Sequence, residues 1–437
     1  MDRPLAPSLA LLTGSLLLLA WSLHLRRRHR LLRDLPTTKT QGVFIGLVEL
    51  KGTAEAEEPL RSFLAEAPCV RYGYTVEERW SRTVVEHYTD KDGKPQTRTR
   101  HESGWSTVAS GGETIPFYLR DDTGVVLIRP DGARIETCPL FSETVSRGDA
   151  LYYAKGPPGA VSDSDHVRRF SESGIPLHAS LYIVGRARER ADIVAAEIAH
   201  DRDAPLFLIS CRSEERVLAN YALGSWATWL FGLAASVGAG ALLAPDVMPA
   251  TPWVPAALGA ALFLSLWGAT WVWVVFNSLV GLRERVRQSW SLIEVELKRR
   301  HDLIPALVRV LDGLRTHEQS LQSALALLRA QQTATAPGVA GPEFGGLAAT
   351  LRAVVEKYPE LKTQSEFARL QTELVATEQR VALARTYYND TATHFATRLE
   401  QVPDRWVARL GRMQPAPLLA ASDFERAAVH VRLADSA

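Results

Sequence analysis

Residues Ala256–Arg300 read AALGAALFLSLWGATWVWVVFNSLVGLRERVRQSWSLIEVELKRR, and their character changes at Phe276. Up to Phe276 the stretch has no charged residue, and its length suits the ~20 apolar residues of a helix that crosses a bilayer core. Beyond Phe276 charged residues appear, while leucine, isoleucine and valine recur at helical spacings of three, four or seven. No turn signal separates the two parts. The sequence therefore predicts a membrane span at 256–276 that continues directly as a soluble helix.

Two further apolar stretches, Leu9–Leu25 and Ala222–Ala244, contain no Lys, Arg, Asp or Glu. The first is short, so a cleaved signal peptide is its competing interpretation. No A-x-A-like cleavage site follows it, and the run RRRHR (Arg26–Arg30) comes at once, so we favour an uncleaved anchor. We therefore predict three transmembrane helices, with a short tail at 1–8 and an outside loop at 245–255.

The orientation of the spans follows from the basic residues that flank them. The predicted juxtamembrane segment 26–41 carries Arg26, Arg27, Arg28, Arg30 and Arg33. Arginines also precede the second span and follow the third, whereas the loop 245–255 has no Lys or Arg. Because positive charge stays inside, we expect the N-terminus outside and both soluble regions on the cytoplasmic face of a cell membrane. The basic run should also touch anionic headgroups, at ~1 kcal/mol per charge near the surface.

Composition excludes several other classes of protein. Lys+Arg 50 nearly balances Asp+Glu 49, so no charge excess points to nucleic acid. Cys69, Cys138 and Cys211 share no CxxC spacing, and Cys69 and Cys138 are interpreted as small core residues rather than metal ligands. No HExxH, P-loop, GxGxxG or GxSxG is present, and SDSDH (Ser162–His166) fits a solvated loop better than a cation site. We therefore predict no metal, no cofactor and no catalytic site.

Residues 42–210 are expected to form a β-rich soluble domain. TVVEHY, DKDGK and QTRTRHESGWSTV predict a long hairpin with a glycine-containing turn. A short acidic helix is expected at Glu55–Ala67, and 156–175, rich in Gly, Pro, Ser and Asp, is expected to be a loop or mobile insertion. With the helical C-terminal region, the fold class is an α+β membrane protein.

The order of CVRYGYTVEE, GWS, IPFYLRDDTGVVLI and LYIVGRARE resembles the GIDE, or beside-a-membrane, domain. That domain lies between two spans in mitochondrial membrane-bound RING ubiquitin ligases and in bacterial and plant relatives. The residues that carry the resemblance are Cys69, Tyr72, Trp105, Pro116, Phe117, Asp121, Gly124 and Gly185. The pairs Gly104–Trp105 and Pro116–Phe117 are interpreted as turn and core anchors, with a peptide or lipid groove as the alternative. A RING needs Cys/His pairs, and no cysteine follows Phe276, so we do not expect ligase activity.

The C-terminal region, 277–437, is predicted to be an antiparallel helical bundle. Pro305 lies inside the first helical stripe and should kink that helix or mark its end. TATAPGVAGPEFGG (Thr333–Gly346) breaks the pattern, which resumes over 347–399 with an interruption at Tyr358–Pro359. A last short helix is expected at Asp423–Leu433.

FNSLVGLRERVRQSWSLIEVELKRRHDLIPALVRVL, YPELK, FARLQTEL and TEQRVALARTYYND resemble, in this order, the LemA family. The matching positions that we single out are Arg299, Arg300, His301, Asp302, Pro305, Tyr358, Pro359, Glu378, Arg385, Tyr388 and Asn389. The resemblance implies a membrane-anchored, elongated helical bundle without an established catalytic activity. KRRHD (Lys298–Asp302) should form i,i+4 ion pairs and pairs with the opposite helix; an acid/base cluster and a charge-reading surface are the alternatives. Asn277 and Asn389 should bond across the bundle.

These observations favour a non-enzymatic scaffold or sensor that presents both modules at the cytoplasmic membrane face. The expected partners are the lipid bilayer and other membrane or envelope proteins, or further copies of the chain. One alternative is a ubiquitin-transferase-related protein. Another is a pore or transporter component, although the spans lack the charged residues that usually mark an ion path.

Overall fold

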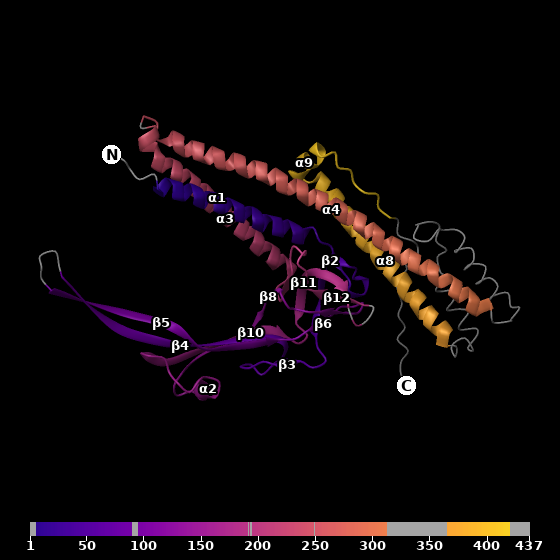
Figure 1. Ribbon diagram of the computed structural model, residues 1–437, viewed down its shortest axis with the longest axis horizontal. Helices are drawn as coiled ribbons and strands as arrows, with labels where there is room; N and C mark the ends of the chain where they lie inside the picture. The colour runs from indigo at the N-terminus through magenta and orange to yellow at the C-terminus, as the bar shows by residue number, and fades with distance from the viewer. Residues whose placement is uncertain are drawn as a thin grey trace. The chain divides into compact units, whose positions relative to one another are not determined.

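The structure is a computed structural model that describes residues 6–89, 95–190, 192, 195–248, 250–312 and 365–419. It divides into two compact units (Figure 1). The β-rich unit is Thr37–Arg216, and the helical unit combines the chain up to Pro36 with the chain from Val217 onward. The β-rich domain thus begins at Thr37, slightly earlier than the predicted boundary at 42.

The first sheet of the β-rich unit has eight strands. They are β1 (Thr37–Thr38), β2 (Gly46–Glu55), β6 (Phe117–Arg120), β7 (Val125–Ile128), β8 (Arg134–Glu136), β11 (Ser180–Glu189), β12 (Ala196–Ala199) and β13 (Leu208–Ser210). Because β2 pairs with both β6 and β11, the strands β2, β6, β7, β12 and β11 close into a ring. Leu50 of β2 stands opposite Ile183 of β11, and both are fully buried. Both belong to one buried cluster that also contains Val48, Leu181 and Ile198, and this cluster is a core of the unit.

The second sheet has five strands and contains the predicted hairpin. The strands are β3 (Leu60–Arg61), β4 (Pro68–Thr89), β5 (Pro95–Thr114), β9 (Cys138–Ser146) and β10 (Ser164–Pro176); η1 (Thr40–Gly42) and α2 (Ala150–Ala154) complete the unit. β4 and β5 pair along their whole length, so the hairpin is confirmed.

Two predictions for this unit are wrong. The expected loop at 156–175 contains most of β10, a strand that pairs with both β4 and β9. The expected acidic helix at Glu55–Ala67 is replaced by β3 and a turn whose backbone N–H groups, at Phe63, Leu64 and Ala65, donate to the carboxylate of Glu172. In both places a buried polar side chain forms hydrogen bonds with backbone groups. A hydropathy pattern does not reveal such hydrogen bonds.

The helical unit contains three helices long and apolar enough to cross a membrane, as predicted. Its helices are α1 (Ala6–Arg33), α3 (Glu214–Val247), α4 (Trp253–Asp312), α8 (Ser365–Glu400) and α9 (Asp404–Leu410). α1 continues through the basic run to Arg33. Residues 26–33 of the predicted juxtamembrane segment 26–41 are therefore helical. α3 reaches Val247 and α4 begins at Trp253, so the connection between them is shorter than the predicted loop 245–255.

Small residues hold the three candidate spans together. The hydroxyls of Ser15 and Ser22 in α1 donate to the carbonyl oxygens of Gly232 and Ser225 in α3, each at 2.8 Å, so the two helices run antiparallel. Between α3 and α4, a Cβ added to Gly240 would lie 2.2 Å from the Pro255 carbonyl oxygen. Only glycine permits this approach, which is typical of helix packing in membranes, where small residues let backbones come close.

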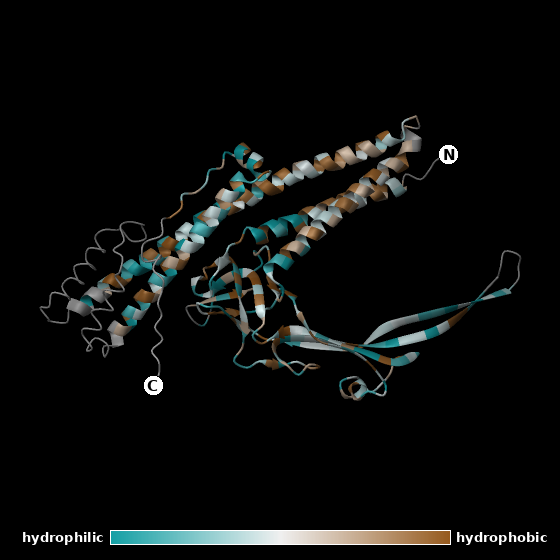
Figure 2. Cartoon of the chain, turned by 180° about the vertical axis from the view of Figure 1, so that it is seen from behind, coloured by the Kyte–Doolittle hydropathy of each residue, from teal (hydrophilic) through white to brown (hydrophobic). Residues whose placement is uncertain are grey.

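α4 runs without a break from the candidate span into the hydrophilic region, as the sequence predicts (Figure 2). The sequence predicts either a kink or an end at Pro305, and the helix does not end there, because it continues to Asp312. α8 packs antiparallel on the second half of α4: Arg380 Nε lies 3.1 Å from Glu296 Oε2, and the rings of Tyr388 and Trp290 are 5.3 Å apart. Their shared core consists of Leu282, Val286, Ile293, Leu297, Val381, Tyr388, Ala392 and Phe395.

The described residues therefore contain an antiparallel helix pair. The predicted further helices of a bundle would involve 313–364 and 420–437, which lie outside the described residues. The break at Thr333–Gly346, Tyr358, Pro359 and the final helix at Asp423–Leu433 lie outside them too.

Candidate functional site

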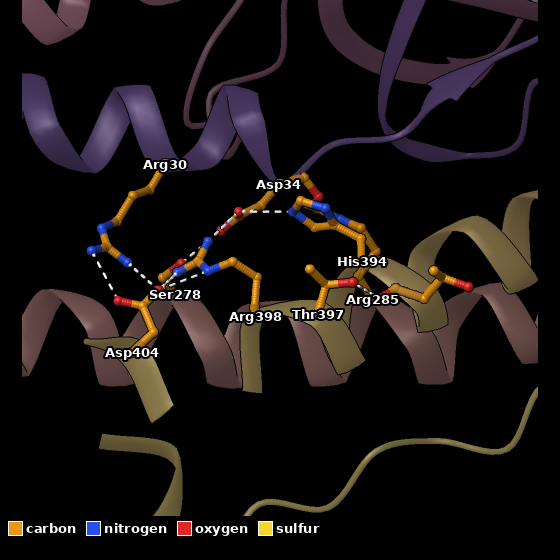
Figure 3. A network of polar contacts seen from close by, with 9 residues as sticks. Arg30, Asp34, Ser278, Arg285, His394, Thr397, Arg398 and Asp404 are labelled. Carbon is orange, nitrogen blue, oxygen red and sulfur yellow. Dashed lines mark hydrogen bonds and ion pairs between the residues drawn. The ribbon is translucent and has the colours of Figure 1, made fainter. Parts of the chain in front are cut away.

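A buried ionic network joins the end of α1 to α8 and α9 (Figure 3). Asp34 directly follows α1, Arg398 lies in the last turn of α8, and Asp404 begins α9. The Arg398 guanidinium donates to Asp34 Oδ1 through Nη1 and to Asp404 Oδ2 through Nε, the latter at 2.7 Å. Arg30 of α1 makes a two-pronged pair with Asp404, at 3.1 and 3.3 Å. We call Arg30, Asp34, Arg398 and Asp404 the boundary network.

Asp34 has three further partners. The Ser278 hydroxyl of α4 donates to Asp34 Oδ2 at 2.7 Å, and His394 Nε2 of α8 lies 3.2 Å from Oδ1. Arg285 Nη1 donates to the Asp34 carbonyl oxygen at 2.9 Å. Burial by itself raises the pKa of the Asp34 carboxyl, but the contacts with His394, Arg398 and Ser278 outweigh it and hold the pKa below its usual value.

The geometry of the boundary network suits positioning rather than catalysis. The Arg398, Asp34 and Asp404 side chains are 2%, 5% and 8% exposed. Every carboxylate oxygen of Asp34 and Asp404 accepts at least one hydrogen bond. Removing one partner of such a buried pair typically costs about 3–5 kcal/mol. The network therefore fixes how the α8–α9 segment meets the end of α1.

A cleft of about 240 Å³ lies beside the network, and we call it the arginine cleft. Its lining residues are Arg26, His29, Arg30, Arg33, Ala222, Ser225, Trp226, Arg398, Gln401, Val402, Pro403 and Asp404. The Arg26 guanidinium lies 4.9 Å from the centroid of the Trp226 ring and 5.7 Å from that of Trp267. Four arginines and one aspartate thus line the cleft.

The structure separates the five arginines that the sequence assigns to the membrane surface. Arg26, Arg30 and Arg33 line the arginine cleft, and Arg30 also forms an ion pair with Asp404. Arg27 lines a second cleft, of about 490 Å³, against Trp273 and Asn277 of α4, whereas Arg28 lines neither. Their contact with headgroups stays a prediction.

The LemA-like positions that the structure describes lie on both helices of the pair. Arg299, Arg300, His301 and Asp302 lie on α4 well beyond the boundary network, and the ion pair of Arg299 is with Glu296 in its own helix, at 3.3 Å. An ion pair between the two helices joins Glu296 to Arg380. Glu378 and Arg385 lie on α8.

Two hydrogen-bond predictions for the helix pair need correction. Asn277 Nδ2 donates to the Trp273 carbonyl oxygen of its own helix, at 2.9 Å, rather than across the bundle. Asn389 donates to the carbonyl oxygen of Leu419 and accepts from its N–H, at 3.0 and 2.9 Å. The Tyr388 hydroxyl likewise donates to the Pro417 carbonyl oxygen at 2.8 Å. Tyr388 and Asn389 therefore hold the extended chain that follows α9.

The GIDE-like positions divide between the two sheets. Cys69 and Tyr72 lie on β4 and Trp105 on β5, whereas Phe117 begins β6 just after Pro116. Cys69 and Phe117 are buried, so their assignment to the core is confirmed. Trp105 is 37% exposed and lies in mid-strand with the Arg169 guanidinium 4.6 Å from its ring centroid, so its assignment as a turn anchor is wrong.

The remaining GIDE-like positions stabilise turns and close strand packing. Asp121 accepts hydrogen bonds from the N–H groups of Thr40 and Thr123, at 2.8 and 2.7 Å, and from Gly124 at 3.0 Å. Burial opposes the charge, but the bonds from Thr40 and Thr123 lower the pKa of Asp121 to about 2. A Cβ added to Gly185 would lie 2.7 Å from Ile198 Cγ2. These roles are structural, and among the described residues no group of three His, Cys, Asp or Glu is placed to hold a metal ion.

Asp34, Arg398 and Asp404 are not among the residues predicted from the sequence, although the sequence contains one signal for Arg398. In α8 the buried side chains Val381, Tyr388, Phe395 and Arg398 follow one another at helical spacing. An arginine on such a buried stripe needs an acidic side chain as its partner, because a buried charge without a partner is strongly unfavourable.

Two family models match the chain. Residues 85–244 match GIDE, described as E3 Ubiquitin ligase, and residues 289–433 match the LemA family. The GIDE match includes Trp105 to Gly185 and most of α3 but begins after Cys69 and Tyr72. The LemA match includes Arg398 and Asp404. Comparison with curated proteins and with solved structures gave no match. The chain therefore contains one segment that matches the GIDE model and one that matches the LemA model, together with three helices long and apolar enough to cross a membrane.

Proposed function

We propose that the protein is a non-enzymatic, membrane-anchored scaffold or sensor that presents its GIDE and LemA segments at the cytoplasmic face. The observation that carries this proposal is the boundary network, in which Arg398 holds Asp34 and Asp404 in a buried site. A scaffold needs a defined geometry between its anchor and its interaction surfaces. A network in which every carboxylate oxygen accepts a hydrogen bond supplies such a geometry.

The continuity of α4 supports the same proposal. α4 carries the span and, beyond Phe276, the surface on which α8 packs, so the helix pair has a covalent anchor in the membrane. The boundary network adds a second attachment, to the first span through Arg30 and Asp34. Two attachments restrict the orientation of the LemA segment more than one flexible tether would.

The proposed sidedness is tested by labelling single cysteines with a membrane-impermeant maleimide. Ser162, Thr251 and Arg409 are exposed positions in the β-rich unit, the α3–α4 connection and α9. We expect Thr251→Cys to react in intact cells, and Ser162→Cys and Arg409→Cys to react only after permeabilisation. The unsubstituted chain gives the background from its own three cysteines. Labelling of Ser162→Cys in intact cells would contradict the cytoplasmic placement of the β-rich unit.

The scaffold role is tested by photo-crosslinking from defined surfaces. A crosslinking residue is placed at exposed Thr99 on β5 or exposed Thr386 on α8, with exposed Leu262 in the span of α4 as the lipid-facing control. We expect Thr99 and Thr386 to give discrete protein adducts and Leu262 to give mainly lipid adducts. If neither soluble position gives a reproducible adduct in membranes, the scaffold proposal fails.

The second candidate function is ubiquitin-transferase-related, because the matched GIDE model is described as E3 Ubiquitin ligase. The chain has no cysteine after Phe276 with which to build a RING. A transfer assay with purified chain, ubiquitin and the activating and conjugating enzymes separates the two functions. Chain-dependent ubiquitin conjugates would favour this candidate over the scaffold.

A further inference from the structure

We infer that the arginine cleft binds the phosphate of an anionic phospholipid headgroup. The cleft opens where two candidate spans reach the same membrane boundary. Arg26 is the first charged residue after Leu25, and the opposite wall is Ala222, Ser225 and Trp226, the start of the second apolar stretch. The hydrogen bond from Ser22 to Ser225 aligns these two helix ends. Tryptophan and arginine at this depth are typical of the headgroup level.

The cleft contains positive charge that the protein does not neutralise. Arg30 and Arg398 are engaged by Asp404 and, for Arg398, by Asp34. By contrast, within the part of the chain that the structure describes, no carboxylate lies within ion-pair distance of Arg26 or Arg33. An anion that enters the cleft therefore meets two available guanidiniums, which match the geometry of phosphate oxygens.

Arg26 is held in place before any ligand arrives. Its guanidinium lies over the Trp226 ring and near the Trp267 ring, and Nε lies 3.5 Å from the Ser225 hydroxyl. Cation–π contacts of this kind restrict a long side chain without consuming all of its N–H donors. The guanidinium is thus preorganised, which lowers the entropic cost of binding.

The part of the cleft that the α8–α9 connection lines favours a lipid over soluble phosphate. Val402 and Pro403, between α8 and α9, line the cleft, and Val402 is 65% exposed. An exposed valine and proline beside two arginines suit a ligand with a phosphate and an apolar glycerol ester portion. A lipid headgroup and free inorganic phosphate offer the same phosphate group, so the experiment has to distinguish these two ligands. The inference depends on membrane association alone, and a chain that binds no protein partner would still retain the lipid.

The test is native mass spectrometry of the purified full chain in uncharged detergent. The probes are dioleoyl phosphatidylglycerol and dioleoyl phosphatidylcholine, added at equal amounts. We expect one phosphatidylglycerol to remain bound in preference to phosphatidylcholine. Arg26→Gln and Arg33→Gln should each weaken this binding by about tenfold or more, because each removes charge-assisted hydrogen bonds to phosphate. Inorganic phosphate in excess should not displace the lipid.

Arg28→Gln is the matched control, because it removes the same charge from the same helix but does not line the cleft. A diffuse surface charge is worth only about fivefold. Equal losses in Arg26→Gln and Arg28→Gln, or equal retention of the two lipids, would overturn the inference. Displacement by inorganic phosphate would assign the cleft to soluble phosphate and overturn its assignment to lipid. Arg33 is exposed at the end of α1, so Arg33→Gln carries the test if Arg26→Gln does not fold.

Discussion

Replacing Arg398 with methionine removes the guanidinium that joins two buried carboxylates. Loss of one partner of a buried ion pair costs about 3–5 kcal/mol. The lower end applies here, because Asp404 keeps its two contacts with Arg30 and Asp34 keeps those with His394 and Ser278. We therefore expect Arg398→Met to weaken the docking of α9 on α1 by about 3 kcal/mol, which corresponds to about 150-fold in the docking equilibrium.

Hydrogen exchange of the full chain in detergent measures this loss segment by segment. Local opening exposes backbone N–H groups, so peptides from the end of α8 and from α9 should lose protection by about the same factor. Peptides from the β-rich unit should not change. The control is Arg409→Met, which removes an arginine from the exposed face of α9. If Arg398→Met and Arg409→Met differ by less than about threefold, the boundary network does not hold α9 and the reasoning is refuted.

Three further results are expected. Because the pKa of Asp34 is lowered on folding, its charge stabilises docking above about pH 4, and this stabilisation is lost as the pH falls through the lower folded pKa. The difference in hydrogen exchange between wild type and Asp34→Asn should therefore shrink over that range. A difference that stays constant with pH would contradict this. Asp121→Asn should destabilise the β6–β7 turn by about 1–3 kcal/mol at neutral pH, and its effect on exchange should fade toward the folded pKa of about 2. Gly185→Ala should lower the stability of the β-rich unit in thermal melts by about 1–3 kcal/mol. The control Gly73→Ala, whose added Cβ has its nearest neighbour at 3.9 Å, should lower the stability much less. Equal melting temperatures for the two variants would argue against close packing at Gly185.

The spans, the hairpin and the continuous α4 were predictable because each depends on a local, continuous pattern. A bilayer requires an uninterrupted apolar helix, and Ala256–Phe276 meets that demand without help from the rest of the chain. The β4–β5 hairpin is likewise set by alternation around one turn. Such features need no knowledge of distant partners.

β10 was missed because two of its buried residues, Arg168 and Glu172, are charged and find their partners elsewhere in the chain. Arg168 is completely buried, yet it pairs with the equally buried Glu78 of β4 at 3.0 Å. Glu172 is buried because it binds the backbone N–H groups of a distant turn. The boundary network was not predicted for the same reason. Asp34 and Arg398 are far apart in sequence and meet only because α8 runs back along α4.

The length of α4 has a mechanical consequence. The part beyond Phe276 extends for about 54 Å at ~1.5 Å per residue, so a change of about 10° in the tilt of its span moves Asp312 by about 9 Å. A thinner or thicker bilayer alters the tilt of a span by hydrophobic mismatch. We therefore expect a change in bilayer thickness to displace the α8 surface, and the second attachment at Arg30 and Asp34 should make that displacement depend on the tilt of α1 as well.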